Sequence, residues 1–430
     1  MRVFIRFSLA LFIGFGMAPM AQAAEGEAFY SLKQVYEMAR AKSEQLRIAQ
    51  EGIAQARALG VQAVGTALGD FNFEITDFRQ DARTSGSDSG VESTSNLVTR
   101  TNRRFTYAQP LFDGFRSYAL LREARSLEAQ RMWDQERFEH LLFLDVANTF
   151  YEILKLRDEL RILADIHDLF ESRIQELNER EAIGRSRVSE LITARSRMKL
   201  MESDILLQDS ALKQSLFELA FLTGQSLTAG QLLDHTEPRM LSLDASPALS
   251  LSERPDIRAV DEEILIRSYA LNSAQAGFWP EVGLDFNLYD RREGFQEGND
   301  WDVLVTFDIP IFDGGQTWGE VQFAGSDLEI ARLESQEYKR QATQEVQQNF
   351  VSWQAHIKAY KILKASAQLA EKNFHIQKDE YTRNLVNNLE VLSSLEDYLD
   401  SLRQKNSIFY EMNKRYWQYQ VSIGECCEFS

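Results

Sequence analysis

The spacing of apolar residues follows the same order twice along the chain. Each time a helical pattern comes first, at 31 to about 65 and at 254 to about 277. Two runs of alternating apolar and polar side chains follow it, at 71–76 and 104–107 in the first half and at 282–288 and 301–309 in the second. Alternation of this kind predicts strands with one face in an apolar medium. We therefore expect β-hairpins at about 68–111 and about 281–312.

Stretches without proline follow each predicted hairpin. The prolines lie at positions 19, 110, 238, 247, 255, 280 and 310, so that 111–237 and 311–430 contain none. Both stretches are rich in helix-favouring residues, and Gly184 is the only glycine between Phe115 and Thr223. We expect long helical hairpins at 115–224 and 316–424, which turn at Gly184 and near Asn384. A continuous helix over 115–183 would be about 100 Å long, a length typical of coiled coils.

The two halves repeat each other at a fixed offset of 200 residues. One short motif returns in full, with Pro110, Phe112, Asp113 and Gly114 matched by Pro310, Phe312, Asp313 and Gly314. Downstream, residues 188–192 match 388–392, and Gly224 matches Gly424. A register kept over this distance predicts a duplicated supersecondary unit. The first unit would span 24–231 and the second 254–424, with a connector at 232–253 and a tail at 425–430.

The N-terminus has the pattern of a secretory signal. Arg2 and Arg6 accompany a largely apolar run at 3–17, and positions 21–23 fit the small-x-small cleavage rule, so we expect residues 1–23 to be a signal peptide. No cysteine lies near this point, and no N-terminal lipid is expected. The two cysteines, Cys426 and Cys427, are adjacent, which predicts no disulfide framework and leaves their role open.

The charge balance limits the partners. The formal net charge is -18, and loss of two arginines with the signal peptide would make it -20. That balance disfavours nucleic acid as a partner, because phosphate binding needs a basic face. An ordinary acidic periplasmic protein would have the same charge. No run of 18 apolar residues follows the signal, so no transmembrane helix is expected.

The predicted strands are too few to close a barrel within one chain. Small barrels need about eight strands, and an open edge cannot face lipid because its backbone groups would lack hydrogen-bond partners. Several chains would have to pool their strands, and three chains would supply twelve, although strand counting also permits a dimer. The alternating runs carry aromatic residues suited to a lipid face: Phe71, Phe73, Phe105, Tyr107, Phe286, Trp301 and Phe307. A soluble β-sandwich could use the same residues as its core.

The sequence contains no pattern of a catalytic or metal site. The five histidines, at 140, 167, 235, 356 and 375, are scattered, and only Glu371 and His375 lie one helical turn apart. With no second pair nearby we expect no metal. We find no phosphate-binding glycine loop and no nucleophile elbow, and we expect neither a cofactor nor an enzyme. The basic residues Arg100, Arg103 and Arg104 fit either lipopolysaccharide phosphates or a solvated strand end.

Taken together, the duplication, the Pro-x-Phe-Asp-Gly corners, the break at Gly184 and the terminal Gly224 and Gly424 resemble the TolC family of outer-membrane factors. The resemblance covers about 30–424. It implies a mixed fold, a membrane β-barrel above a long α-helical barrel, in a homotrimer that shares twelve strands. It also implies a channel in the outer membrane with its helical part in the periplasm. Such a channel is the exit duct of a tripartite efflux or type I secretion system, with a periplasmic adaptor and an inner-membrane transporter as partners.

The resemblance further implies a gate at the periplasmic helix tips. Glu390 matches an acidic position that forms a carboxylate ring around the channel axis, while the second ring of some members falls on Ser393, so one ring is expected. Tyr381 matches a tyrosine bonded to an acidic residue of the neighbouring tip, here Glu190, which follows Ser189. Val386 stands where another link uses arginine, and Asn384 stands where the first unit has Gly184. The alternative is that both glutamates are solvated residues in helix turns.

Two other classes of protein compete with the channel. A periplasmic adaptor would carry one helical hairpin flanked by compact β-domains, whereas this chain carries two hairpins. A structural coiled-coil protein without a channel has no use for alternating aromatic strands that end at proline corners. The sequence leaves open the cargo and the resting state of the gate.

Overall fold

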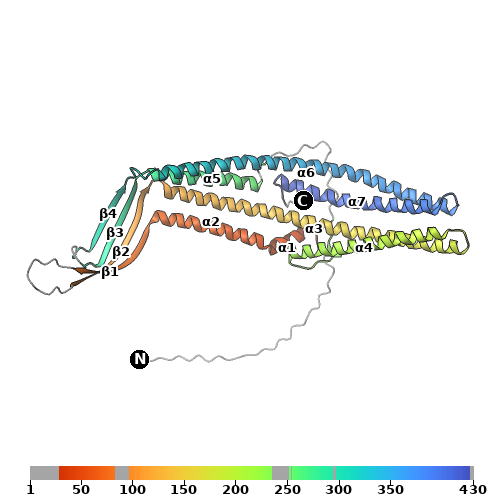
Figure 1. The fold of residues 1–430 in the computed structure, drawn as a ribbon, viewed down its shortest axis with the longest axis horizontal. Coiled ribbons are helices and arrows are strands. Elements are labelled where there is room, and N and C mark those ends of the chain that lie inside the picture. The colour runs from red at the N-terminus through yellow and green to blue at the C-terminus, as the bar shows by residue number, and fades with distance from the viewer. Residues whose placement is uncertain (1–28, 83–95, 235–250, 253, 294–296, 427–430) are drawn as a thin grey trace, which may run out of the picture.

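The protein is an elongated rod (Figure 1). A β-sheet lies at one end, and the turns that join two pairs of long helices lie at the other. The computed structural model describes residues 29–82, 96–234, 251–252, 254–293 and 297–426. The predictions for the signal peptide, for most of the connector at 232–253 and for most of the tail at 425–430 fall outside these residues.

The sheet has four antiparallel strands in the order β1-β2-β3-β4. They are β1 Asp70–Ala82, β2 Asn96–Asp113, β3 Glu281–Arg291 and β4 Trp301–Asp308. The central pair β2–β3 joins strands from the two halves of the chain, with Tyr107 opposite Phe286. Phe71 and Phe73 lie against Phe105, with ring centroids 6.0 and 4.7 Å apart, and all three rings are exposed in the single chain. Among the strands that the structure describes, β1 and β4 each pair on one side only.

Within the described residues, seven α-helices form the rest of the rod. Their bounds are α1 Leu32–Lys42, α2 Glu44–Leu68, α3 Arg116–Ala182, α4 Val188–Thr223, α5 Pro255–Gln275, α6 Gln316–Thr382 and α7 Asn388–Ser422, and the short 3-10 helices are Ala229–Gln231 and Ala276–Phe278. Next to the sheet the helices pack in the order α2-α3-α5-α6, and toward the turns in the order α4-α3-α7-α6. α3 and α6, each of 67 residues, therefore run through both layers.

One expected helix is divided in two. The sequence predicts a single helix over 31–65, but the structure ends α1 at Lys42 and begins α2 at Glu44. The hydroxyl of Ser43 accepts a hydrogen bond from the amide of Leu46 at 3.3 Å, which is the role that makes serine a favoured N-cap. A capping serine therefore interrupts an otherwise helical pattern.

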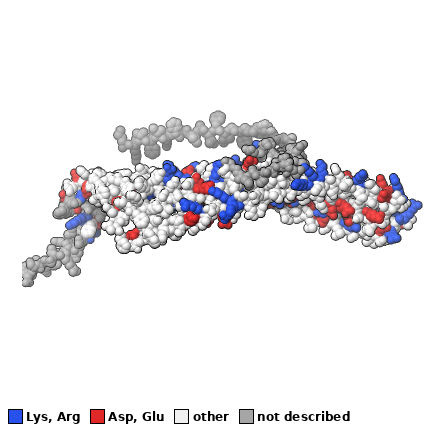
Figure 2. Space-filling view, turned by 90° about the horizontal axis from the view of Figure 1, so that it is seen from above, with Lys and Arg blue, Asp and Glu red and all other residues white. Residues whose placement is uncertain are grey.

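Three apolar clusters lie along the rod. The first, at its middle, packs α1, α3, α4 and α7 around Phe143, Phe150 and Trp417. The second lies toward the turns and contains Phe170, Leu177, Leu392 and Leu395 from the facing hairpins. The third joins α6 to α7 around Trp353. None of the helices that the structure describes has both the length and the hydropathy needed to cross a bilayer. Figure 2 shows that charged side chains gather over the middle and the turn end of the visible face.

Candidate functional site

The two corners between sheet and helix share one capping geometry. Asp113 accepts hydrogen bonds from the amide of Ser117 at 2.8 Å and from its hydroxyl. Asp313 accepts from the amides of Thr317 at 2.7 Å and Gly315 at 2.9 Å, and hydrogen bonds from Thr317 and these amides lower the pKa of Asp313 to about 2. Each carboxylate thus binds free amides at the start of a 67-residue helix, where negative charge is stabilising.

The other motif residues at the two corners differ in their setting. Gly114 and Gly314 both have left-handed φ angles, 68° and 73°, and a Cβ on Gly114 would lie 2.6 Å from the Ala276 carbonyl oxygen. Pro110 lies within β2, where the pairing with β3 shifts register between Pro110 and Phe112. β4 instead ends at Asp308, before Pro310, and Phe312 is almost fully exposed. The first corner is therefore packed and the second is open in the single chain.

The turns at the opposite end of the rod also share one geometry. Gly184 and Asn384 both adopt left-handed φ angles, 72° and 59°. In each turn an amide reaches back to the last helical residues: Arg185 N binds Arg180 O at 2.8 Å, and Leu385 N binds Glu380 O at 3.0 Å. This pattern closes helix C-termini at a left-handed residue, which glycine and asparagine tolerate best. Both residues therefore form tight turns at the tips of the helical hairpins, and their part in a gate stays a prediction.

The two predicted gate glutamates make hydrogen bonds within their own turns. Glu390 accepts from the amide of Asn387 at 3.1 Å, and the side chain of Asn387 accepts in return from the amide of Glu390 at 3.1 Å. Glu190 accepts from the hydroxyl of Ser186 at 2.9 Å. Ser189 and Ser393 are exposed, and Val386 packs against the second apolar cluster. A carboxylate ring involves several chains, so the ring at Glu390 stays a prediction.

Tyr381 has partners that the sequence did not suggest. Its buried ring lies close to two guanidinium groups of α3, with the carbon of Arg173 at 3.8 Å and that of Arg180 at 4.4 Å from the ring centroid. Arg173 also donates from Nε to the side-chain oxygen of Asn388 at 2.8 Å. We call Arg173, Arg180, Tyr381 and Asn388 the tip clasp. Among the described contacts Tyr381 makes no hydrogen bond to Glu190 within the chain.

Further links join the two hairpins along their seam, away from the turns. Arg197 of α4 lies 2.5 Å from Glu396 of α7. Closer to the middle of the rod, Arg403 donates to Glu159 at 2.9 Å, Tyr410 to Asp158 at 2.7 Å and Lys414 to Glu152 at 2.5 Å. The hairpins are thus tied together at many points near the middle, and the tip clasp is the described link between them that lies nearest the turns.

One side-chain group has ligand atoms close enough for a metal ion. His167, Asp168 and Glu171 of α3 place theirs within 4.8 Å of one another. The two carboxylates are exposed, so the surroundings supply no buried partners to orient them. The sequence-based prediction of no metal site is left as a prediction.

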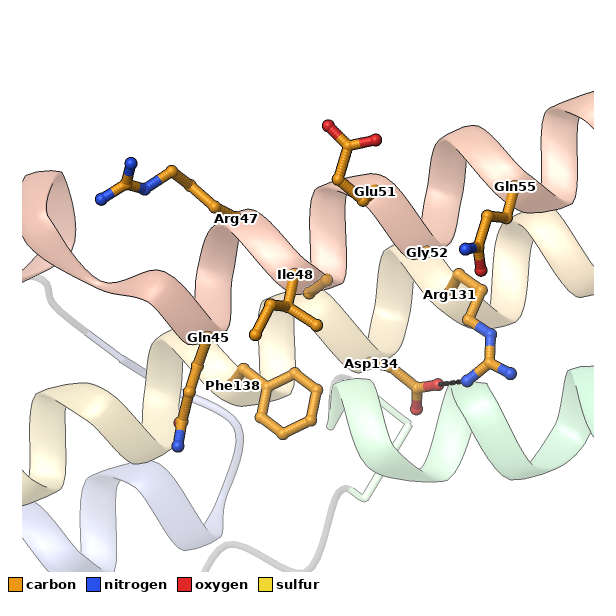
Figure 3. Close-up of a pocket in the computed structure, with 10 residues that line it drawn as sticks. Gln45, Arg47, Ile48, Glu51, Gly52, Gln55, Arg131, Asp134 and Phe138 are labelled. Atoms are coloured by element: carbon orange, nitrogen blue, oxygen red, sulfur yellow. Dashed lines mark hydrogen bonds and ion pairs between the residues drawn. The ribbon is translucent and has the colours of Figure 1, made fainter.

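A groove runs along one free edge of the helical layer. It lies between α2 and α3, and its lining includes Ile48, Gly52, Arg131, Asp134 and Phe138. Figure 3 shows Ile48 and Phe138 on the same side of the two helices, with Arg131 and Asp134 paired beside them. Ile48 and Phe138 are both exposed in the single chain. An apolar groove at an edge is a surface suited to contact with a further helix.

Comparison with known proteins finds a family match in the second half of the chain. Residues 247–411 match the family model described as outer membrane efflux protein. This region is therefore similar to outer membrane efflux proteins. Outer membrane protein TolC of Vibrio cholerae is 21% identical over 329 residues, which cover 71% of this chain and 72% of that protein. The resemblance to the TolC family that the sequence motifs predicted is therefore confirmed.

Other curated relatives are named for export. The pyoverdine export outer membrane protein OpmQ of Pseudomonas putida is 26% identical over 310 residues, or 69% of this chain and 65% of the relative. The chain thus spans just under two thirds of the length of that protein. The alkaline protease secretion protein AprF of Pseudomonas aeruginosa is 23% identical over 60% of this chain and 57% of that protein. These names refer to export and secretion and not to a catalysed reaction.

Solved structures share the whole fold. A membrane protein from Pseudomonas aeruginosa superposes with a TM-score of 0.81 at 18% identity, over 93% of each chain. The outer membrane protein VceC of Vibrio cholerae gives 0.78 at 20% identity, over 92% of this chain and 96% of the other. At this identity the likeness establishes the fold, which is that of TolC-like outer-membrane channels.

Proposed function

We propose that the protein is an outer-membrane channel, a homotrimer that forms the exit duct of an efflux or secretion system. The observation that carries this proposal is the continuous passage from an open, aromatic-bearing sheet into two helices of 67 residues, within a TolC-like fold. Strands β1, β2 and β3, of 13, 18 and 11 residues, are long enough to cross the apolar part of a bilayer. Helices of about 100 Å can cross much of the periplasm.

The free edges of the sheet and of the helical layer support a ring in which each chain contacts the next head to tail. β1 and β4 lie at opposite edges of the sheet, and in the helical layer α2 lies at one edge and α6 at the other. A sheet edge exposed to lipid leaves backbone groups without partners, so β4 of one chain would pair with β1 of the next. Three chains would supply twelve strands, which is enough to close a barrel. The apolar groove beside α2 would then receive α6 of the adjacent chain.

The internal repeat is part of the proposal. α3 and α6 begin at Arg116 and Gln316, and α4 and α7 begin at Val188 and Asn388, an offset of 200 residues in both cases. We take 24–231 and 254–424 as two copies of one unit, separated by the connector at 232–253. Two similar units per chain would make a trimer pseudo-sixfold, which suits a round duct.

The proposed partners are a periplasmic adaptor and an inner-membrane transporter. The names of relatives refer to different cargos, namely pyoverdine, toluene and alkaline protease. Similarity to these relatives therefore does not select one class of cargo for this chain. The proposed selectivity lies at the turns, where Glu390 of three chains would form a ring that attracts cations.

Conductance across a planar lipid bilayer tests the channel and the ring. We expect the purified full-length protein to give a small cation-selective conductance, because carboxylates at a narrow axis attract cations. Glu390→Ala should lower the preference for cations, measured as the reversal potential in a salt gradient. Glu297→Ala, in the loop between β3 and β4, is the matched control because it lies at the other end of the rod.

The outcomes separate the two ideas. No conductance from membrane-extracted protein would contradict the channel. A conducting wild type whose selectivity is the same in Glu390→Ala would retain the channel and remove the ring.

A further inference from the structure

One face of the sheet is apolar along most of its height. On β3 and β4 the register forms four successive apolar pairs on this face: Val282 with Phe307, Leu284 with Val305, Phe286 with Val303 and Leu288 with Trp301. The opposite face of the same two strands is mostly polar, with Asn287 opposite Asp302. The apolar face continues across β2 and β1, where Phe105 lies opposite both Leu288 and Phe73. Successive side chains of a strand point to opposite faces, so this apolar face is the one that would contact lipid in the proposed barrel.

The apolar face ends at a pair of arginines. Arg103 on β2 lies two residues before Phe105, on the same face, and directly opposite Arg291 on β3. From Val282 to Arg291 the strand rises about 30 Å, which corresponds to about 23 Å across a bilayer at a strand tilt of about 40°. The apolar band of a membrane barrel is about 25 Å tall. The two arginines therefore lie at the boundary of the lipid that is farther from the helices, which is the outer surface in the proposed orientation.

The carboxylates beside the two arginines compensate their charge only in part. Like charges directly opposite each other on neighbouring strands are destabilising. Arg103 is paired with Asp290, but Oδ2 of Asp290 lies 3.9 Å from Nη1 of Arg103, too far for a hydrogen bond. Glu293 accepts from Nε of Arg291 at 2.7 Å, and the same carboxylate also accepts from the amide of Thr101 at 2.6 Å. In the part of the chain that the structure describes, the guanidinium of Arg103 thus has an ion pair and no hydrogen bond.

The neighbouring arginines of β2 face the other way. Arg104 donates to Glu74 at 2.8 and 2.7 Å on the polar face of the sheet. Arg100 is three residues from Arg103, so strand alternation places it on the polar face as well. The sequence grouped these three arginines as one basic cluster, whereas the structure leaves only Arg103 on the apolar face and adds Arg291 opposite it.

We propose that Arg103 and Arg291 bind a phosphate group of a lipid in the outer leaflet, namely a phosphate of the lipid A part of lipopolysaccharide. The inference rests on the proposed place of the sheet in the outer membrane. A phosphate between the two guanidinium groups would accept hydrogen bonds from both, and guanidinium groups suit phosphate because they donate two parallel hydrogen bonds. The phosphate would also offset the repulsion between the two arginines. Asp290 would compete with it for Arg103, while the apolar face below would contact the acyl chains.

Binding of lipid A to the full-length protein in a neutral detergent tests the site by native mass spectrometry. We expect Arg103→Gln and Arg291→Gln each to weaken the binding of bisphosphorylated lipid A about tenfold, the change that follows from loss of one hydrogen bond between charged groups. Lipid A without its phosphates should bind the wild type as weakly. Arg100→Gln is the matched control, because it removes an exposed arginine of the same strand from the polar face. Asp290→Asn removes the competing carboxylate and should tighten binding, a change that misfolding of the variant would not produce.

Three outcomes would overturn the proposal. Equal binding of phosphorylated and dephosphorylated lipid A would show that only the acyl chains are recognised. An equal loss of binding in Arg100→Gln would show attraction by overall charge and not by a site. Complete displacement of the lipid by an equal concentration of inorganic phosphate would assign the two arginines to a free anion.

Conductance of the same wild-type preparation separates this inference from the proposed function. A protein that conducts but binds both forms of lipid A equally would reject the phosphate site and retain the channel. A protein that prefers phosphorylated lipid A through Arg103 and Arg291 but does not conduct would retain the site and reject the channel.

Discussion

Arg254, just before α5, has a partner for each of its guanidinium nitrogens. Nε and Nη2 bind the two oxygens of Asp256 at 3.0 and 2.7 Å, Nη1 binds the carbonyl of Ser422 at 2.7 Å, and Nη2 also binds Glu345 at 2.9 Å. A buried charge is tolerated when its hydrogen bonds are satisfied in this way. At the tip, by contrast, Nη2 of Arg173 has no hydrogen-bond partner among the described residues.

His140 on α3 lies beside this anchor and gives the stability of the protein a pH dependence. Burial lowers the pKa of His140 to about 4, and the charge of Arg137 acts in the same direction. The unfolded chain therefore binds a proton between about pH 4 and 6.5 that the folded chain does not. We expect the free energy of unfolding to fall by about 2–3 kcal/mol as the pH drops through that window, and to be constant above it for this group.

Urea unfolding followed by circular dichroism at pH 4.5 and 7 measures this effect. His140→Gln should remove the difference contributed by the residue, whereas His375→Gln, which alters an exposed position on α6, should leave it in place. An equally steep pH dependence in wild type and His140→Gln would contradict the assignment.

At the scale of elements, the two turns should respond differently when a glycine is removed from one and introduced into the other. Gly184 and Asn384 hold left-handed φ angles, which cost a β-branched residue roughly 1–2 kcal/mol. Gly184→Val should therefore loosen the α3–α4 turn and speed amide exchange at 183–188. Asn384→Gly should leave amide exchange at the α6–α7 turn unchanged or slightly slower, since glycine adopts this conformation without strain. Faster exchange in Asn384→Gly would show that the asparagine side chain, and not its backbone, shapes that turn.

The sequence predicted those elements whose signal is local. Alternation at 71–76 and 282–288 located strands, and the absence of proline located the long helices, because both patterns follow directly from backbone geometry. The break at Ser43 was missed, since a capping serine differs little from a helical one until the chain around it is placed. The partners of Tyr381 were missed because Arg173 and Arg180 lie on the other hairpin. A contact between distant segments leaves no trace in the spacing of one sequence.

At the scale of the whole molecule, exposed apolar side chains mark the surfaces that copies of the chain would share. Ile48 is 70% exposed in the groove beside α2, an exposure that costs free energy in water. Ile48→Glu should shift the purified protein from trimer toward monomer, measured as mass by light scattering in detergent. Ile48→Val keeps the apolar surface and should remain trimeric. A trimer that survives Ile48→Glu would place the contact between chains away from this groove.

The equal length of α3 and α6 restricts how the gene can change. Both helices run from the sheet end to the turns and have 67 residues each. Their equal length places the two turns at the same distance from the sheet. Seven residues inserted into only one of them would displace its turn by about 10 Å, which would separate Tyr381 from Arg173 and Arg180. An insertion or deletion in α3 therefore has to be matched by one of equal length in α6. Unpaired changes of length can accumulate instead in the segments between the elements.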